Sequence, residues 1–216
     1  MSVAVIDACI DVSRCHPPRL LDVVRWQPHA RGRLEEAALQ LCAEKGFGAT
    51  SVAEIAERAE LTERTFFRHF ADKREVLFSG QQELNETLMK AVEQAPDSVS
   101  PLHAVGAGLD AVVALFVDRW QPARRRQAVI DATPALQERE LAKLASLVTA
   151  LSDTLSRRGV PATTARLTAE LGVAVFKVAF ERWIGAGDDD AGRGRADLGR
   201  LIHVMLGELA SIITHG

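Results

Sequence analysis

A chain of 216 residues with 47% hydrophobic residues is long enough for one large domain or two small ones, each with an apolar core. The formal net charge of −3 excludes a protein that holds nucleic acid by bulk positive charge, so any cations that contact DNA must be placed locally. The three cysteines form neither a disulfide framework nor a zinc-ligand spacing, and a reducing cytoplasm is the expected setting.

The first 23 residues do not resemble a signal peptide, because they lack a positive start and because Asp7 and Asp11 interrupt the apolar run. Pro17 and Pro18 break any helix there. Two interpretations remain open: residues 1–24 are a disordered extension, or translation begins at Val24. Both place the start of the first domain at residue 25.

Residues 30–45 carry the first strong helical pattern. Its apolar residues recur at helical spacing and are Leu34, Ala37, Ala38, Leu41 and Cys42. Gly46 is the expected C′ residue that ends the helix. Because Cys42 lies on the apolar stripe, we expect a small buried hydrophobe rather than a reactive thiol.

Two short helices separated by a tight turn follow. Ser51 is placed to cap the first, which extends to residue 59, and Glu60 and Leu61 leave room only for a turn. Thr62 is placed to cap the second, whose Phe66 and Phe70 anchor it to a core. A short helix pair of this kind predicts a helix-turn-helix.

The second of these helices carries its polar side chains on the face away from the core. Arg64 and Thr65, with Glu63 beside them, are expected to reach base edges. Phosphate contacts are expected from Thr50, Arg68, His69 and Lys73, and Ser51 combines a capping role with a possible phosphate contact. Arg33 is expected along the DNA backbone or in the minor groove. Each arginine could also simply be solvated.

The remaining helices predict an all-α body. A long connector capped by Asp72 is expected to run to Ala95. Further helices are expected over residues 101–119, 124–131, from Pro134 to the break at Gly159, 163–184 and 195–214, with a flexible acidic linker at 185–194. No stretch alternates with period two, so no sheet is expected, and no apolar run reaches the roughly 18 residues of a membrane span.

The motif residues together resemble the N-terminal signature of TetR-type transcriptional regulators. The resemblance covers residues 31 to 78 and rests on residues 50–52, Ile55, Ala56, residues 65–70, Lys73 and Leu77. It implies a three-helix DNA-binding head at residues 25–78 and a ligand-binding and dimerisation body at 79–216, with ligand-driven movement passing through the connector. Two residues depart from the family pattern. Glu60 stands where glycine is usual, and a left-handed backbone there would be strained. Phe67 stands where a tyrosine commonly touches a phosphate.

Large rings beside a few polar groups suggest a pocket for a small lipophilic effector in the body, although an ordinary core explains the same residues. The candidate pocket residues are His103, Phe116, Trp120, Arg126, Phe176, Phe180 and Trp183. The last two helices are the expected dimer interface, through Leu171, Val175, Leu198, Ile202, Met205, Leu206 and Leu209.

Enzyme chemistry finds no support in the sequence. The six histidines lie far apart and form no metal-ligand spacing, and neither a nucleophile elbow nor a phosphate-binding loop occurs. We therefore expect no cofactor and no metal. The resemblance implies a repressor that is released by its effector, and because DNA sites for such heads come in symmetric pairs, we expect it to bind palindromic double-stranded operator DNA as a homodimer. The alternative is an all-helical ligand-binding or interaction protein without sequence-specific DNA binding.

Overall fold

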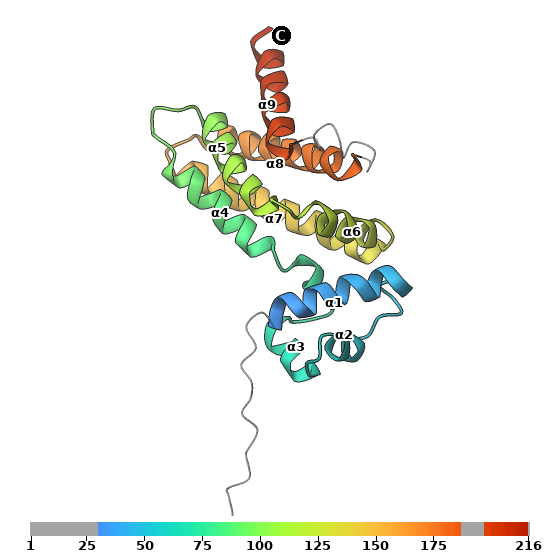
Figure 1. The fold of residues 1–216 in the computed structure, drawn as a ribbon. Helices are drawn as coiled ribbons and strands as arrows, with labels where there is room; N and C mark the ends of the chain where they lie inside the picture. The colour runs from blue at the N-terminus through green and yellow to red at the C-terminus, as the bar shows by residue number, and fades with distance from the viewer. Residues whose placement is uncertain (1–29, 187–196, 216) are drawn as a thin grey trace, which may run out of the picture.

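The computed structural model describes residues 30–186 and 197–215, without the side chains of residues 210 and 212–215. These residues form helices and no strand, which confirms the all-α prediction. Figure 1 shows an elongated molecule with helices α1 to α3 at one end and α9 projecting from the other. The predictions for residues 1–24 and for most of the acidic linker lie outside the described residues.

The head contains α1 (Ala30–Lys45), α2 (Val52–Arg58) and α3 (Glu63–His69). The predicted apolar stripe of α1 is buried, and so are Phe66 and Phe70. Gly46 adopts a φ of +84°, as expected of a residue that ends a helix in the left-handed region. The local sequence signals of the head are therefore confirmed in the structure.

The prediction of one long connector helix is wrong. The chain forms a short 3₁₀ helix, η1 (Glu75–Phe78), and α4 (Gln81–Gln94) begins only after Ser79 and Gly80. Two arginine side chains donate hydrogen bonds to backbone carbonyls at this break: Arg126 to Leu77 at 2.6 Å and Arg31 to Ser79 at 2.7 Å. The break is further favoured by Gly80, because glycine is a poor helix former. Asp72 closes the turn that leads into η1, since its carboxylate accepts hydrogen bonds from the backbone N–H groups of Arg74 and Glu75, and the N-cap position of η1 is Arg74.

The body contains α5 (Pro101–Val113), η2 (Ala114–Phe116), α6 (Trp120–Asp131), α7 (Pro134–Arg157) and α8 (Ala162–Gly185), and α9 spans Leu198–His215. The helix expected over residues 101–119 ends early, because the chain turns through exposed Val117 and left-handed Asp118. Helix α6 begins at Trp120 rather than Arg124. Pro122 is tolerated in its first turn, where backbone N–H groups have no partner within the helix.

The helices pack around two apolar clusters. The body cluster brings α4, α5, α7, α8 and α9 together, and Gly108 of α5 allows close approach: a Cβ there would lie 2.7 Å from Leu88 Cδ1. The head cluster contains residues of α1 to α3 and η1 but also Val129, Ile130 and Leu136 from α6 and α7. The core of the head is thus completed by the body.

No single helix within the described ranges is both long and apolar enough to cross a membrane. One helix pair, Pro101–Phe116 with Trp120–Asp131, meets that test of length and composition together, and it is bent by 99°.

Candidate nucleic-acid interface and ligand cavity

Side-chain caps fix the two helices of the helix-turn-helix. Ser51 Oγ accepts a hydrogen bond from the Glu54 backbone N–H at 3.2 Å, and the Glu54 carboxylate accepts one from the Ser51 N–H at 2.8 Å. Hydrogen bonds from Lys45 and Ser51 lower the pKa of Glu54 to about 2. Thr62 Oγ1 accepts a hydrogen bond from the Thr65 N–H at 3.2 Å. Both predicted caps are confirmed, and they hold α3 at a defined angle to α2.

The outer face of α3 carries the predicted base-reading side chains. Glu63, Arg64 and Arg68 are exposed, and the Phe67 ring is 55% exposed although it contacts Phe66 edge to face. Thr65 is half-buried, and its hydroxyl hydrogen-bonds with that of Thr62 at 3.0 Å. This face offers two guanidinium groups and one aromatic ring to a groove, which suits arginine contacts with guanine and an apolar contact with a thymine methyl.

Most cations of the head are already engaged by other groups. Residues 30–78 contain eight Lys and Arg against nine Asp and Glu. Five of these cations form ion pairs, namely Arg31, Arg33, Lys45, Arg58 and Arg74. Only Arg64 and Arg68 form neither an ion pair nor a side-chain hydrogen bond within the described part of the chain. Among residues 30–78, these two arginines on α3 are thus the cations freely available to DNA.

Two of the predicted phosphate contacts turn inward instead. Lys73 Nζ donates hydrogen bonds to the carbonyl oxygens of Phe47 and Thr50 at 2.7 and 2.6 Å and lies 4.2 Å from the centre of the Phe47 ring. The buried Thr50 hydroxyl donates to the Gly46 carbonyl at 2.9 Å. Both side chains fasten the loop between α1 and α2. The geometry therefore favours a structural role for Lys73 and Thr50 over phosphate contact.

His69 does not present a charged group to DNA either. Its Nε2 atom is buried without a hydrogen-bond partner among the described residues. Burial lowers the pKa of the His69 imidazole from its ordinary 6.5, and the charges of Arg68 and Arg31 lower it further. Because Nε2 is buried and both effects disfavour the charged ring, the geometry does not favour the predicted phosphate contact.

The turn between α2 and α3 has the left-handed backbone expected at Glu60. Its φ is 52°, a conformation that costs a residue with a Cβ about 1 kcal/mol relative to glycine. Arg33 reaches across from α1 to pair with the Glu60 carboxylate, with Nη2 at 3.0 Å from Oε2.

A cavity of about 260 Å³ lies where the head meets the body. Its walls include Glu35 and Leu39 of α1, residues 76–80 of η1 and the following break, and parts of α4, η2, α6, α7 and α8. Its apolar walls are formed by Phe78, Leu84, Phe116, Leu144, Leu147, Phe176 and Phe180. Because the head and the break after η1 form part of the wall, a bound ligand would touch the DNA-binding half of the molecule directly.

The structure brings only some of the predicted pocket residues to this cavity. Phe116, Arg126, Phe176 and Phe180 line it. Trp120 and Trp183 lie outside the cavity wall, where the indole N–H of Trp120 donates to the Trp183 carbonyl at 2.9 Å. His103 does not line the cavity either: it belongs to the first turn of α5, where its Nδ1 hydrogen-bonds with Ser100 Oγ.

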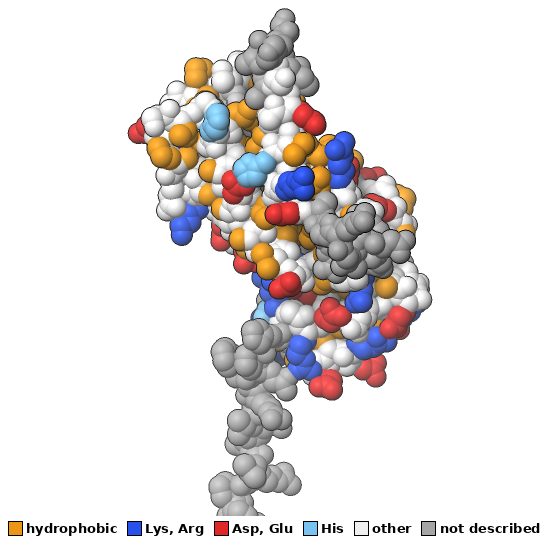
Figure 2. All heavy atoms as spheres, turned by 45° about the horizontal axis from the view of Figure 1, so that its top comes forward, with side chains coloured by type: hydrophobic (Ala, Val, Ile, Leu, Met, Phe, Trp, Pro, Cys, Tyr) orange, Lys and Arg blue, Asp and Glu red, His pale blue; other side chains and the backbone are white. Residues whose placement is uncertain are grey.

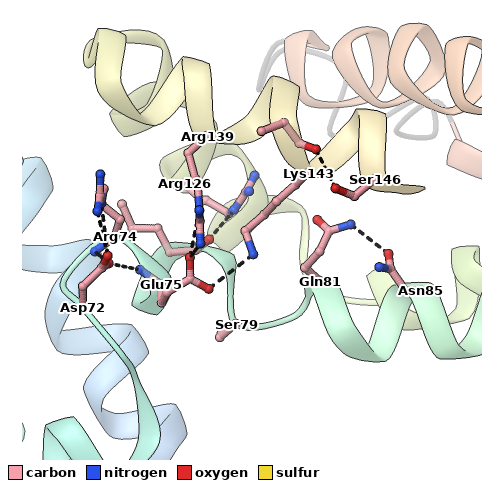
Figure 3. Close-up of polar contacts among 12 residues, drawn as sticks. Asp72, Arg74, Glu75, Ser79, Gln81, Asn85, Arg126, Arg139, Lys143 and Ser146 are labelled. Carbon is pink, nitrogen blue, oxygen red and sulfur yellow. Dashed lines mark hydrogen bonds and ion pairs between the residues drawn. The ribbon is translucent and has the colours of Figure 1, made fainter. Parts of the chain in front are cut away.

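Charged groups join η1 to helices α6 and α7 beside the cavity. Glu75 of η1 forms ion pairs with Arg139 and Lys143 of α7 (Figure 3). Burial opposes ionisation of Glu75, but these two cations more than offset it, so the pKa of its carboxyl stays below the ordinary value. Arg126 of α6 donates to the Leu77 carbonyl and pairs with Glu140 at 3.3 Å. These contacts couple the position of η1 to α6 and α7.

The far end of the body exposes apolar side chains (Figure 2). On α8, Leu167 is 59% and Val178 is 41% exposed, and both share a face with half-buried Leu171. Val204 of α9 is also exposed. Four predicted interface residues face the body instead and are buried within the chain, namely Val175, Leu198, Ile202 and Met205. Leu206 and Leu209 are half-buried against the body cluster.

The described residues contain no group of three or more His, Cys, Asp or Glu side chains arranged to hold a metal ion.

Comparisons with known proteins agree with the arrangement of the head. Residues 34–79 match the bacterial regulatory proteins of the TetR family. The HTH-type transcriptional regulator TcmR of Streptomyces glaucescens is 39% identical over 83 residues, which is 38% of this chain and 37% of TcmR. The chain thus matches well under half the length of this relative.

The fold as a whole resembles solved regulator structures. FadR from Bacillus subtilis, in complex with stearoyl-CoA, aligns over 83% of this chain and 97% of its own with a TM-score of 0.54 and 17% identity. A transcriptional regulator from Rhodococcus sp. Rha1 aligns over 84% of this chain and 96% of its own with a TM-score of 0.51 and 23% identity. At these identities the likeness concerns the fold. With the helix-turn-helix geometry, the match over residues 34–79 identifies the head as a DNA-binding domain of the TetR type of helix-turn-helix transcriptional regulators.

Proposed function

We propose that this regulator is a ligand-released repressor that binds palindromic operator DNA as a homodimer in the cytoplasm. The observation that carries the proposal is the cavity shared by head and body, because Glu35 and Leu39 of α1 line it together with residues of α6, α7 and α8. A small lipophilic ligand in this space would change the packing between the DNA-binding helices and the rest of the chain.

The route from cavity to DNA passes through the break after η1. Ser79 and Gly80 line the cavity, and the Ser79 carbonyl accepts a hydrogen bond from Arg31 of α1. Arg126 lines the same cavity and holds the Leu77 carbonyl. A ligand that displaces either guanidinium group changes the orientation of the head relative to α4. By linkage, operator DNA must then weaken ligand binding by the same factor.

Dimer formation is supported by the exposed apolar face of α8 and α9. Leu167, Val178 and Val204 have no cover among the described residues. The exposed stripe of α8 formed by Leu167, Leu171 and Val178 is typical of an interaction site, and a second copy of the chain would cover it. The pairing would also fix the distance between two α3 helices, as symmetric half-sites require.

Two experiments test the proposal. Selection of duplexes from a random-sequence pool by the full chain should enrich an inverted repeat, whereas no enrichment would favour the helical ligand-binding protein without a DNA target. A thermal-shift screen of lipophilic compounds and acyl thioesters, with stearoyl-CoA as the first probe, should then find a ligand that raises Tm and releases the selected duplex. A ligand that raises Tm and leaves duplex affinity unchanged would contradict the release mechanism.

A further inference from the structure

Glu60 occupies a position where its backbone is strained and its side chain gains no apolar burial. Its φ is 52°, and its side chain is 85% exposed. Glycine would remove the strain. The one contact of its carboxylate within the described part of the chain is the ion pair with Arg33, which suggests that the side chain itself has a role.

Arg33 is held where a DNA phosphate would otherwise attract it. It lies in the first turn of α1 and bridges to the turn that precedes α3, two residues before the cap Thr62. The start of a recognition helix enters the major groove, so groups beside it lie next to the phosphates that border the groove. Arg33 is only 28% exposed, and its guanidinium is directed at Glu60 rather than outward.

We propose that Glu60 acts as an internal substitute for a DNA phosphate: it neutralises Arg33 in the free protein, and an operator phosphate must displace it. This inference rests on the proposed DNA-binding function. The exchange is accessible because the Glu60 carboxylate is solvent-exposed, and ion pairs at the protein surface contribute little to stability. With most other head cations already paired, this exchange keeps affinity for arbitrary DNA low and leaves recognition to Arg64 and Arg68.

The substitution Glu60→Gln separates this role from the backbone strain, because glutamine has nearly the same shape and the same left-handed backbone. It leaves Arg33 free to neutralise one more phosphate per head. Each phosphate contact contributes about 0.9 to the slope of log K against log salt, which corresponds to a gain of roughly fivefold per head at about 0.15 M salt. The gain should be equal for operator and scrambled duplexes, since phosphates carry no sequence information.

The experiment measures duplex binding by fluorescence anisotropy between about 50 and about 200 mM salt. It compares the full chain with Glu60→Gln, Arg33→Ala, the double variant, and Glu57→Gln. Glu57 is a matched control because it is an exposed glutamate of α2 without an ion pair among the described residues. Thermal melts verify that every variant is folded.

We expect Glu60→Gln to bind both duplexes more tightly with a steeper salt slope, and the double variant to bind like Arg33→Ala alone. Equal affinity of Glu60→Gln and the parent would overturn the inference, as would a gain that persists without Arg33 or that Glu57→Gln reproduces. A parent chain that binds no selected duplex would instead contradict the proposed function, and the inference with it.

Discussion

The two ends of the body differ in how their apolar side chains are covered. At the end beside the head, Val129, Ile130 and Leu136 complete the head cluster, and Glu75 bridges η1 to α7 through ion pairs. At the opposite end, α8 and α9 leave Leu167, Val178 and Val204 exposed. The first end is a closed interface, because its apolar side chains are covered within one chain. The second end is open, and we expect a second chain to cover its exposed apolar side chains.

The largest expected effect comes from a charge on the open end. The double substitution Leu167→Glu with Val178→Glu should yield monomers by sedimentation and weaken operator binding on the order of 100-fold, because two linked heads bind far more tightly than one. Leu141→Glu is the matched control, since Leu141 of α7 is 61% exposed but lies on another helix. A double variant that stays dimeric would show that α8 does not form the interface.

The closed end should respond to the loss of a buried side chain. Ile130 is fully buried in the head cluster, so Ile130→Ala should lower the free energy of unfolding by about 2–5 kcal/mol. Hydrogen exchange should rise in α1 as well as in α6. Leu155→Ala removes an equally buried side chain from the body cluster and provides the comparison. If exchange in α1 rose equally in both variants, the head would not depend specifically on α6.

A smaller effect is expected from the ion pairs at the closed end. Glu75→Gln removes the charge that pairs with Arg139 and Lys143, and we expect it to destabilise the chain by about 1 kcal/mol. The pKa of Glu75 is lowered in the folded state, so its contribution is present above the unfolded pKa and is lost as pH falls through the folded pKa. Melts at neutral pH should therefore separate parent from variant, and the difference should shrink with acid. An equal difference at every pH would contradict this assignment.

The smallest expected effect concerns the capping box of α2. Glu54 has an ordinary carboxyl pKa of 4.5 when unfolded and about 2 when folded, so its contribution should disappear as pH falls between these values. Glu54→Gln should lower Tm by about one degree at neutral pH and by less near pH 2. The exposed position of this carboxylate limits the effect because water screens the pair. An unchanged Tm at neutral pH would show that α2 does not need this cap.

The helix caps of the head could be predicted because their partners are close in sequence. Contacts between residues far apart in sequence could not. The caps Ser51 and Thr62 have their partners within three residues, so the sequence displays them. Lys73, Arg126 and Arg31 bind backbone carbonyls that lie 26, 49 and 48 residues away, and such pairs cannot be read from periodicity. For this reason the sequence indicates neither the inward hydrogen bonds of Lys73 nor the break after η1.

In the body, the sequence predicts which side chains are apolar but not where each one is buried. Helical spacing identifies an apolar side chain but not which of two neighbouring surfaces covers it. Val175 and Leu167 both belong to the apolar residues of α8, yet Val175 faces the core of its own chain and Leu167 faces outward. Of the predicted pocket residues, Phe116 of η2 and Phe180 of α8 converge on the cavity, whereas His103 lies away from it and hydrogen-bonds with Ser100 at the start of α5.

The central claim is that filling the cavity between head and body weakens operator binding. Ala123→Phe tests it most directly, because Ala123 is a nearly buried residue of α6 that lines the cavity, so the added ring takes the place of a ligand. Ala128→Phe places the same ring at an exposed position of α6 and serves as the control. We predict that Ala123→Phe remains a folded dimer and binds the selected duplex at least about tenfold more weakly, within the usual range of allosteric coupling, while Ala128→Phe binds like the parent. A folded, dimeric Ala123→Phe variant with undiminished duplex affinity would contradict the account.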